Sequence, residues 1–204
     1  MGAVYVPSHF EASAEQLTGL LAAPGLVELV SAGPDGLVAT PLPMLHVPAA
    51  SGLGSLHGHV ARNNPHRRLA GATSLAIVRG PDAYVSPSWY PSKAEHGQVV
   101  PTWNYLTAHL HGRLVVHDSV DWLRDLVTRL TEAHEASIGS SWQVTDAPSS
   151  YIDGQLRAIV GVELRIERIE AKAKLSQNRP AADRESVVSA LAASDVADLM
   201  RDNP

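Results

Sequence analysis

The stretch "IVGVELRIERIE" at positions 159–170 alternates apolar and charged residues, and this alternation is the clearest indication of the fold. In a β-strand successive side chains point to opposite faces, so the apolar members would share one face: Val160, Val162, Leu164 and Ile166. The charged members would share the other face: Glu163, Arg165 and Glu167. The segment therefore predicts a half-buried strand with one face packed on a core.

Similar strand patterns occur along the preceding part of the chain. They are "LVELVSAGPDGLVAT" (26–40), "GSLHGHVA" (54–61), "TSLAIVRGPDAYVSPSW" (73–89) and "TWNYLTAHLHGRLVVH" (102–117). Gly33–Gly36 and Gly80–Asp82 are turn sequences, so the first and third stretches each predict a hairpin. Gly112, in the middle of the last stretch, predicts a bulge or a close approach of another backbone.

Helical patterns lie before, between and after these strands, at 14–23, 63–71, 118–137, 151–159 and 183–202. Ser13 and Gln16 form a capping box for the first helix, and Pro24-Gly25 ends it. The clearest helix, 118–137, carries one apolar stripe: Trp122, Leu123, Leu126, Val127 and Leu130.

About six strands joined by hairpins, with peripheral helices, predict an α+β fold built on an antiparallel barrel. We expect a single domain over 1–204, with a helical C-terminal segment at 183–202. Strict alternation of strands with helices is missing, and so is a glycine-rich phosphate loop, which argues against a Rossmann fold.

The composition is that of an ordinary globular protein, with 45% apolar and 18% charged residues in 204. No run of about 18 apolar residues and no signal-peptide pattern is present, so we expect a cytoplasmic protein without a membrane segment. Cysteine is absent, which excludes disulfides and thiolate metal sites. The formal charge of −5 and the lack of a helix-turn-helix sequence argue against direct DNA binding.

Two of the ten histidines lie close together in "LHGHVARNNPHRR" (56–68). His57 and His59 would share one strand face with only Gly58 between them, which suits a planar cofactor lying against the backbone. We expect this face to point into the barrel. The arginines that follow could clamp a phosphate or a carboxylate: Arg62, Arg67 and Arg68. The alternative is a polar strand edge that continues into a basic helix surface.

A second row of histidines occurs in "AHLHGRLVVH" (108–117), with these side chains on one face: His109, His111, Arg113 and His117. Such a row could bind a metal ion. Metal sites, however, usually draw ligands from several elements and include a carboxylate or a thiolate. We therefore favour a solvated or interface face.

The third cluster is aromatic and spans "YVSPSWYPSK" (84–93) and "VPTWNY" (100–105). Aromatic rings with hydroxyl and amide neighbours suit a flat ring system that needs stacking and a few hydrogen bonds. Alternatively, these aromatic residues fill the core of a chain that has a single Phe. The loop "KAKLSQNRP" (172–180) adds a dense group of hydrogen-bond donors, which suits the anionic edge of a planar cofactor.

Six motifs occur in this order along the chain: "YVPSHF" (5–10), "GHVARNNP" (58–65), "YVSPSWYPSK" (84–93), "VPTWNY" (100–105), "AIVGVELRIERIE" (158–170) and "KLSQNRPAADR" (174–184). Together they resemble the PaiB-like family, also called FMN-binding negative transcriptional regulators, which has a split-barrel fold. The resemblance implies an FMN cofactor, or a repressor that binds DNA. It also implies a homodimer with the cofactor at the subunit interface.

The chain departs from the family pattern at two places. "AKAKLSQN" (171–178) replaces the family's "GKWKLSQN", and "TPLP" (40–43) replaces "THLP". Ala173 and Pro41 thus stand where an indole and an imidazole are usual, which favours a larger pocket than FMN requires. The motifs also look similar to a branch of the family, the piperazate synthases. These enzymes use heme b to cyclise an amino-acid substrate, δ-N-hydroxyornithine, by forming an N–N bond.

The resemblance to that heme-dependent branch implies His59 as the axial ligand of the iron, with His57, His109 and His111 as alternatives. Tyr90, Tyr105 or His57 would supply the proton for the leaving oxygen. The expected cofactor contacts are Arg62, Asn64, Arg67, Lys93, Trp103, Lys174, Ser176, Gln177 and Asn178. With FMN instead, the same polar residues would hold the phosphate and ring edges, and Trp103 would cover the isoalloxazine. A heme-degrading split-barrel protein is a further alternative.

Overall fold

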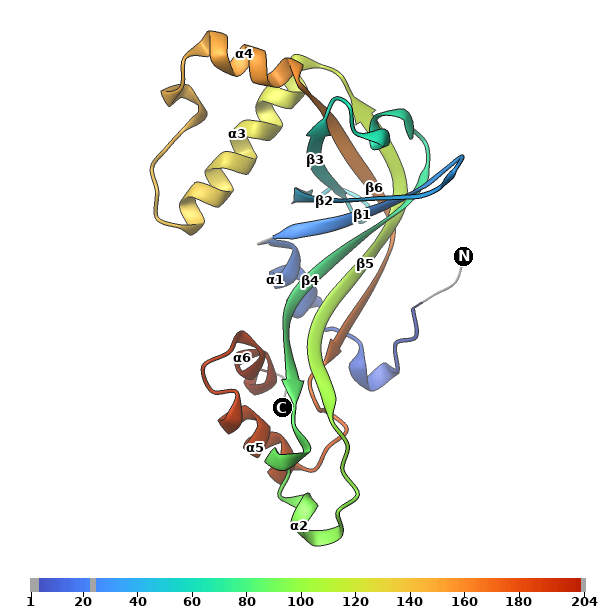
Figure 1. Ribbon diagram of the computed structural model, residues 1–204, viewed down its shortest axis with the longest axis vertical. Helices are drawn as coiled ribbons and strands as arrows, with labels where there is room; N and C mark the ends of the chain where they lie inside the picture. The colour runs from blue at the N-terminus through green and yellow to red at the C-terminus, as the bar shows by residue number, and fades with distance from the viewer. Residues whose placement is uncertain (1–3, 23–24, 203–204) are drawn as a thin grey trace. The chain divides into compact units, whose positions relative to one another are not determined.

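The computed structural model describes residues 4–22 and 25–202, and its central feature is a closed barrel of six strands (Figure 1). Neighbouring strands follow the order β1-β2-β3-β6-β5-β4, and β3 pairs antiparallel with both β2 and β6. The strands are β1 (Leu26–Gly33), β2 (Gly36–Val47), β3 (Ser55–Ala61), β4 (Thr73–Val85), β5 (Thr102–His117) and β6 (Ile159–Lys174). The predicted α+β class and antiparallel barrel are confirmed.

The α-helices are α1 (Ala14–Ala22), α2 (Ser92–His96), α3 (Val120–Ser137), α4 (Ser149–Arg157), α5 (Ala181–Ala190) and α6 (Asp195–Arg201). Short 3-10 helices are η1 (Ser8–Phe10), η2 (Pro65–Arg68), η3 (Pro87–Trp89) and η4 (Val144–Asp146). The predicted capping box of α1 is present, because Ser13 N–H donates to Gln16 Oε1 at 2.9 Å and Gln16 N–H donates to Ser13 Oγ at 3.1 Å. The predicted end of this helix at Pro24 lies outside the described residues. Among the helices of residues 4–22 and 25–202, none combines the length and apolar character needed to cross a membrane.

The chain divides into two compact units. The barrel unit comprises residues 21–78 and 109–169, with β1, β2, β3 and the adjoining parts of the other three strands. The terminal unit comprises residues 1–20, 79–108 and 170–204. It contains the remaining parts of β4, β5 and β6 together with α2, α5 and α6.

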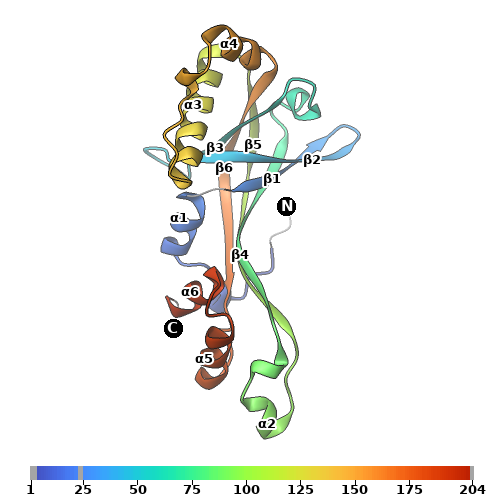
Figure 2. The ribbon, with the colours of Figure 1, turned by 60° about the vertical axis from the view of Figure 1, so that its left-hand side comes forward.

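Alternate residues of the barrel strands fill the interior of the barrel unit, as the period of two predicts. The largest fully buried side chains there include Leu29, Met44, Leu56, Leu110, Leu114 and Leu164. A Cβ on Gly112 would lie 1.8 Å from the carbonyl oxygen of Arg165, so the predicted close backbone approach is confirmed. Figure 2 shows α3 alongside the β3 side of this barrel.

One predicted turn is correct and another is wrong. Gly33 and Gly36 are paired at the end of the β1–β2 hairpin, and Gly36 has a φ of +123°, which favours glycine. The hairpin predicted around Gly80–Asp82 does not form, because β4 runs on as one strand. A Cβ on Gly80 would lie 3.1 Å from Leu20 and 3.2 Å from Leu106, so this glycine permits close packing instead of a turn.

The C-terminal segment is helical, as predicted, but consists of two helices. α5 ends at Ala190, and Ser194 begins α6 by accepting a hydrogen bond from the Ala197 N–H at 3.4 Å. Met200 of α6 is buried, and its sulfur accepts a hydrogen bond from Asn104 Nδ2 at 3.3 Å. α6 thereby packs on β5, and α5 packs on α6.

Candidate functional site

His57 and His59 lie on the outer face of the barrel, contrary to the expectation that they point inward. Their neighbours Leu56 and Val60 are buried in the core, whereas both histidines are only half-buried. Because side chains alternate along β3, the two imidazoles face away from the core. We call this surface the histidine face and define it by His57, His59, His117, Trp122 and Glu163.

Trp122 of α3 is the central side chain of the histidine face. Its ring stacks on the imidazole of His117, with centroids 4.1 Å apart and an interplanar angle of 11°. The imidazole of His57 lies tilted on it at 5.4 Å. A Cβ on Gly161 would lie 2.1 Å from the Trp122 ring, so the indole rests on the bare backbone of β6.

A carboxylate fixes one end of this cluster. His117 Nε2 lies 2.7 Å from Glu163 Oε2, and Arg165 Nε donates to Glu163 Oε1 at 3.1 Å. Burial raises the pKa of Glu163, but the hydrogen bonds from His117 and Arg165 outweigh it and leave this pKa below its ordinary value. Burial lowers the pKa of His57, whose Nε2 lies 2.8 Å from Ser55 Oγ.

His59 differs from the other two histidines of this face in its hydrogen bonding. Its Nδ1 is buried and has no hydrogen-bond partner among the described residues. Burial lowers its pKa, so the imidazole is neutral at physiological pH. A neutral ring with an unsatisfied nitrogen fits a histidine that is held for a ligand, because buried polar atoms otherwise find partners.

The polar residues that follow His59 mostly serve the barrel itself. Arg62 donates to Asp118 Oδ1 and to the Arg157 carbonyl, both at 2.7 Å. Asn64 Oδ1 accepts the His66 N–H at 2.9 Å and so begins η2. Arg67 is exposed on η2. Of the arginine and asparagine residues predicted to hold a cofactor in this unit, Arg67 is therefore the least constrained.

An aromatic and basic surface lies in the terminal unit. Trp103 and Tyr84 are 53% and 47% exposed, and their rings meet edge to face at 6.0 Å. Lys174 Nζ donates to the carbonyl of Trp103 at 2.9 Å and also to Thr102 Oγ1. Burial lowers the pKa of Lys174, and the positive charges of Lys172 and Arg179 lower it further. We call Tyr84, Trp103 and Lys174 the aromatic–basic surface.

The donors of the "KLSQN" loop are mainly engaged with the loop's own surroundings. Ser176 has a φ of +63° and is buried, with its Oγ bonded to Asn104 at 3.0 and 3.1 Å. Gln177 accepts from Leu175 N–H at 2.7 Å and donates to the Ala173 carbonyl at 2.6 Å. These side chains hold the loop in shape, whereas Asn178 is exposed.

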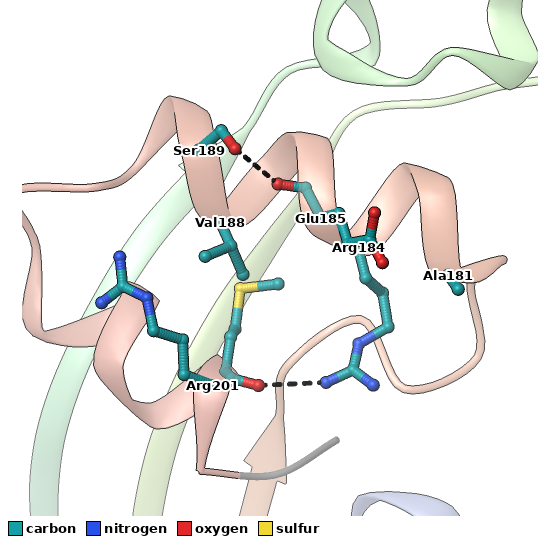
Figure 3. A pocket seen from close by; sticks show the side chains of 7 residues that line it. Ala181, Arg184, Glu185, Val188, Ser189 and Arg201 are labelled. Atoms are coloured by element: carbon teal, nitrogen blue, oxygen red, sulfur yellow. Dashed lines mark hydrogen bonds between the residues drawn. The ribbon is translucent and has the colours of Figure 1, made fainter.

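Three further predicted residues lie in the terminal unit: Tyr90, Tyr105 and Lys93. Tyr90 is 3% exposed and its hydroxyl is buried. Burial raises its pKa, and the guanidinium of Arg179 beside the ring opposes this shift. Tyr105 lies below the ammonium of Lys172, 5.7 Å from the ring centroid, and Lys93 is exposed on α2. The terminal unit also has a pocket of 480 Å³ beside α5 and α6, lined by Arg184, Val188 and Arg201 among others (Figure 3).

Sequence reasoning missed Trp122 and Glu163 as members of the histidine face. Trp122 was placed in the apolar stripe of a helix, and Glu163 on the charged side of a strand. The first placement is compatible with the structure, since Leu123, Leu126 and Leu130 of that stripe are buried. The second is too, since Glu163 is bonded to Arg165 of the same charged face. The missing signal was the glycine at position 161, which leaves room for a large ring above it.

The six-stranded antiparallel barrel defines the protein as a split-barrel protein, and the comparisons with known proteins give its family. Residues 4–168 match the family described as "Putative FMN-binding domain". The chain belongs to this family, which confirms the predicted family resemblance. It is 29% identical over 208 residues to the protease synthase and sporulation protein PAI 2 of Bacillus subtilis, covering 98% of this chain and 97% of that protein.

Other relatives match over a shorter length. An uncharacterized protein of Emericella nidulans is 34% identical over 164 residues, or 67% of this chain. The chain covers 65% of the length of that protein and of an Aspergillus fumigatus relative.

Solved structures share the fold at low sequence identity. The FAD and heme binding protein from Mycobacterium smegmatis has a TM-score of 0.59 at 20% identity, over 85% of this chain and 77% of that one. The flavocytochrome Anf3 from Azotobacter vinelandii has a TM-score of 0.55 at 12% identity, over 79% and 67%.

Proposed function

We propose that the protein binds heme b on the histidine face with His59 as the iron ligand, and that it is an enzyme of the piperazate synthase type. The observation that carries this proposal is the buried Nδ1 of His59, which has no hydrogen-bond partner in the described residues. Burial also lowers the pKa of this imidazole, which favours its neutral form. A neutral imidazole is the form that ligates heme iron. The FAD and heme binding protein from Mycobacterium smegmatis, which has a similar fold, is compatible with heme as well as with a flavin.

The proposed reaction closes δ-N-hydroxyornithine to piperazate with loss of one water. The α-amine nitrogen forms a bond to the hydroxylated nitrogen, the N–O bond breaks, and the oxygen leaves as water without an external oxidant or reductant. When bound, heme iron supplies a Lewis acid for the departing oxygen. The chain must also accept one proton from the attacking amine and donate one to the oxygen.

His57 is the residue of the histidine face that suits proton transfer. It lies on the same side of β3 as His59, and its lowered pKa keeps it able to accept a proton near neutral pH. Tyr90 suits the task less, because its hydroxyl is buried and its pKa is raised. We therefore assign proton transfer to His57 within this proposal.

A second candidate is an FMN-binding oxidoreductase, and the aromatic–basic surface favours it. The exposed Trp103 and Tyr84 rings offer stacking for a flat ring, and the ammonium of Lys174 offers a contact for a phosphate. The family description points to the same cofactor. In this candidate function, the protein would transfer electrons through a flavin and would not form an N–N bond.

The absorption spectrum of the purified protein, followed by titration with hemin and with FMN, separates the two candidates. Heme binding predicts a Soret band, whereas flavin binding predicts a yellow protein with two bands. The heme-loaded protein is then incubated with δ-N-hydroxyornithine, and the molecular mass of the product is measured by mass spectrometry. A product lighter by one water supports the cyclase. Saturable hemin binding with no water loss contradicts the cyclase but keeps the heme site.

A further inference from the structure

The backbone next to the proposed iron ligand is covered by an indole. His59 and Gly161 are cross-strand partners in β3 and β6, and side chains of cross-strand partners lie on the same face. Above Gly161 lies Trp122 of α3, so close that a Cβ on residue 161 would be 2.1 Å from Cζ3 of the ring. The glycine is therefore what allows the indole to occupy this place beside His59.

Two imidazoles flank the same indole, and each is also held by a hydrogen bond. His117 stacks on Trp122 at 4.1 Å and is bonded through Nε2 to Glu163 at 2.7 Å. His57 contacts Trp122 at 5.4 Å and is bonded through Nε2 to Ser55 at 2.8 Å. One ring contact and one hydrogen bond together restrict the rotation of each imidazole, so loss of the indole would release both.

We propose that Trp122 is the positioning residue of the histidine face. Its indole holds the imidazoles of His57 and His117 in place and closes the space beside His59, so that a planar cofactor meets His59 in one orientation. Trp122 itself makes no bond to the reacting atoms in this proposal. The inference rests on the proposed function, because it takes His59 as the ligand of the cofactor.

The test uses four variants of the full chain: Trp122→Ala, Trp122→Phe, Gly161→Ala and, as a control, Gly154→Ala. Gly161→Ala displaces the indole without removing it, whereas a Cβ on Gly154 of α4 meets no atom within 4 Å. The first readout is the NMR shift of the His117 ring protons in heme-free protein, which the stacked indole shields. The second is a hemin titration that records the affinity and the Soret maximum.

We expect Trp122→Ala and Gly161→Ala to remove the shielding of His117, to raise the hemin dissociation constant about tenfold and to shift the Soret maximum. Trp122→Phe should restore most of the affinity, and Gly154→Ala should match the wild type. Circular dichroism checks that each variant is folded, and Trp122→Ala alone decides the question if Gly161→Ala does not fold.

The inference is overturned if the shielding of His117 is lost while hemin affinity and the Soret maximum stay those of the wild type. Trp122 would then only pack α3 on the sheet. If the wild-type protein itself binds no hemin, the proposed function fails, and the inference fails with it. The two failures are distinguishable, because only the second appears in the wild-type titration.

Discussion

Asp183 accepts two hydrogen bonds from Ser92, one from the backbone N–H at 3.1 Å and one from Oγ–H at 2.7 Å, although 91 positions separate the two residues. Both side chains are buried, and Asp183 is 1% exposed. A second link runs beside this one, since the guanidinium of Arg179 lies 4.7 Å from the ring centroid of Tyr90. Two sequence motifs, 84–93 and 174–184, are thereby joined inside the terminal unit, so part of their chemistry is structural.

We expect Asp183→Asn to lower the free energy of unfolding by about 1–3 kcal/mol, because the amide offers one acceptor where the carboxylate offers two. Chemical denaturation followed by circular dichroism measures the change. Glu185→Gln, at an exposed position of the same helix, is the matched control and should stay within about 0.5 kcal/mol of the wild type. Equal stability of the two variants would show that the Ser92 contact contributes little.

Gly112→Ala tests the close approach of β5 and β6 in the barrel. The added Cβ would lie 1.8 Å from the Arg165 carbonyl oxygen, which belongs to a rigid strand and not to a flexible side chain. We expect a loss of about 3 kcal/mol in the free energy of unfolding, or failure to fold. Gly154→Ala, where the new methyl group meets open space, controls for the change in backbone entropy. A Gly112→Ala protein as stable as this control contradicts the geometry.

The strands could be predicted from the sequence because a half-buried strand has a regular period. β6 begins at Ile159, and the predicted apolar face contains Val160, Val162 and Leu164, which are fully buried. The role of Gly80, which lies inside β4 and not in a turn, could not be predicted in this way. Glycine serves turns and close packing equally, and here Leu20 and Leu106, distant in sequence, decide which role applies.

The candidate site could be predicted only in part. The pair of His57 and His59 on one face followed from strand periodicity, but which face meets the core depends on the whole barrel. The donors of Ser176 and Gln177 were assigned to a cofactor, whereas in the structure Ser176 Oγ–H donates to Asn104 Oδ1 and Gln177 Nε2 donates to the Ala173 carbonyl. The sequence shows which side chains carry hydrogen-bond donors, but only the folded structure shows which of these donors are already bonded within the protein.

Glu163 predicts a dependence of stability on pH. The pKa of Glu163 in the folded protein is below the ordinary glutamate value of about 4.3. The ionised carboxylate therefore adds its full contribution to the free energy of unfolding above that pH. This contribution is lost as the pH falls through the folded pKa. The stability difference between wild type and Glu163→Gln should therefore shrink on acidification below about pH 4. Urea denaturation at several pH values measures it. Glu132→Gln, exposed on α3, should show no such trend.

Lys174→Gln tests the aromatic–basic surface as a phosphate site. The lowered pKa of Lys174 arises from burial and from the charges of Lys172 and Arg179, so a bound phosphate would relieve the repulsion between these cations. If FMN binds there, we expect its dissociation constant to rise about tenfold in the variant. Fluorescence titration with FMN measures this. Arg201→Gln is the control, and an equal loss in both variants would indicate a nonspecific effect of charge.

His59→Ala is the most direct test of the proposed iron ligand. We expect the variant to lose the Soret band after hemin titration, because the only ring nitrogen assigned to the iron is gone, and added imidazole should restore part of the band. His134→Ala, which removes an exposed histidine of α3, should bind hemin like the wild type. An unchanged Soret band in His59→Ala transfers the ligand role to another histidine. His57→Ala is then the next variant to titrate, since its imidazole lies on the same face of β3.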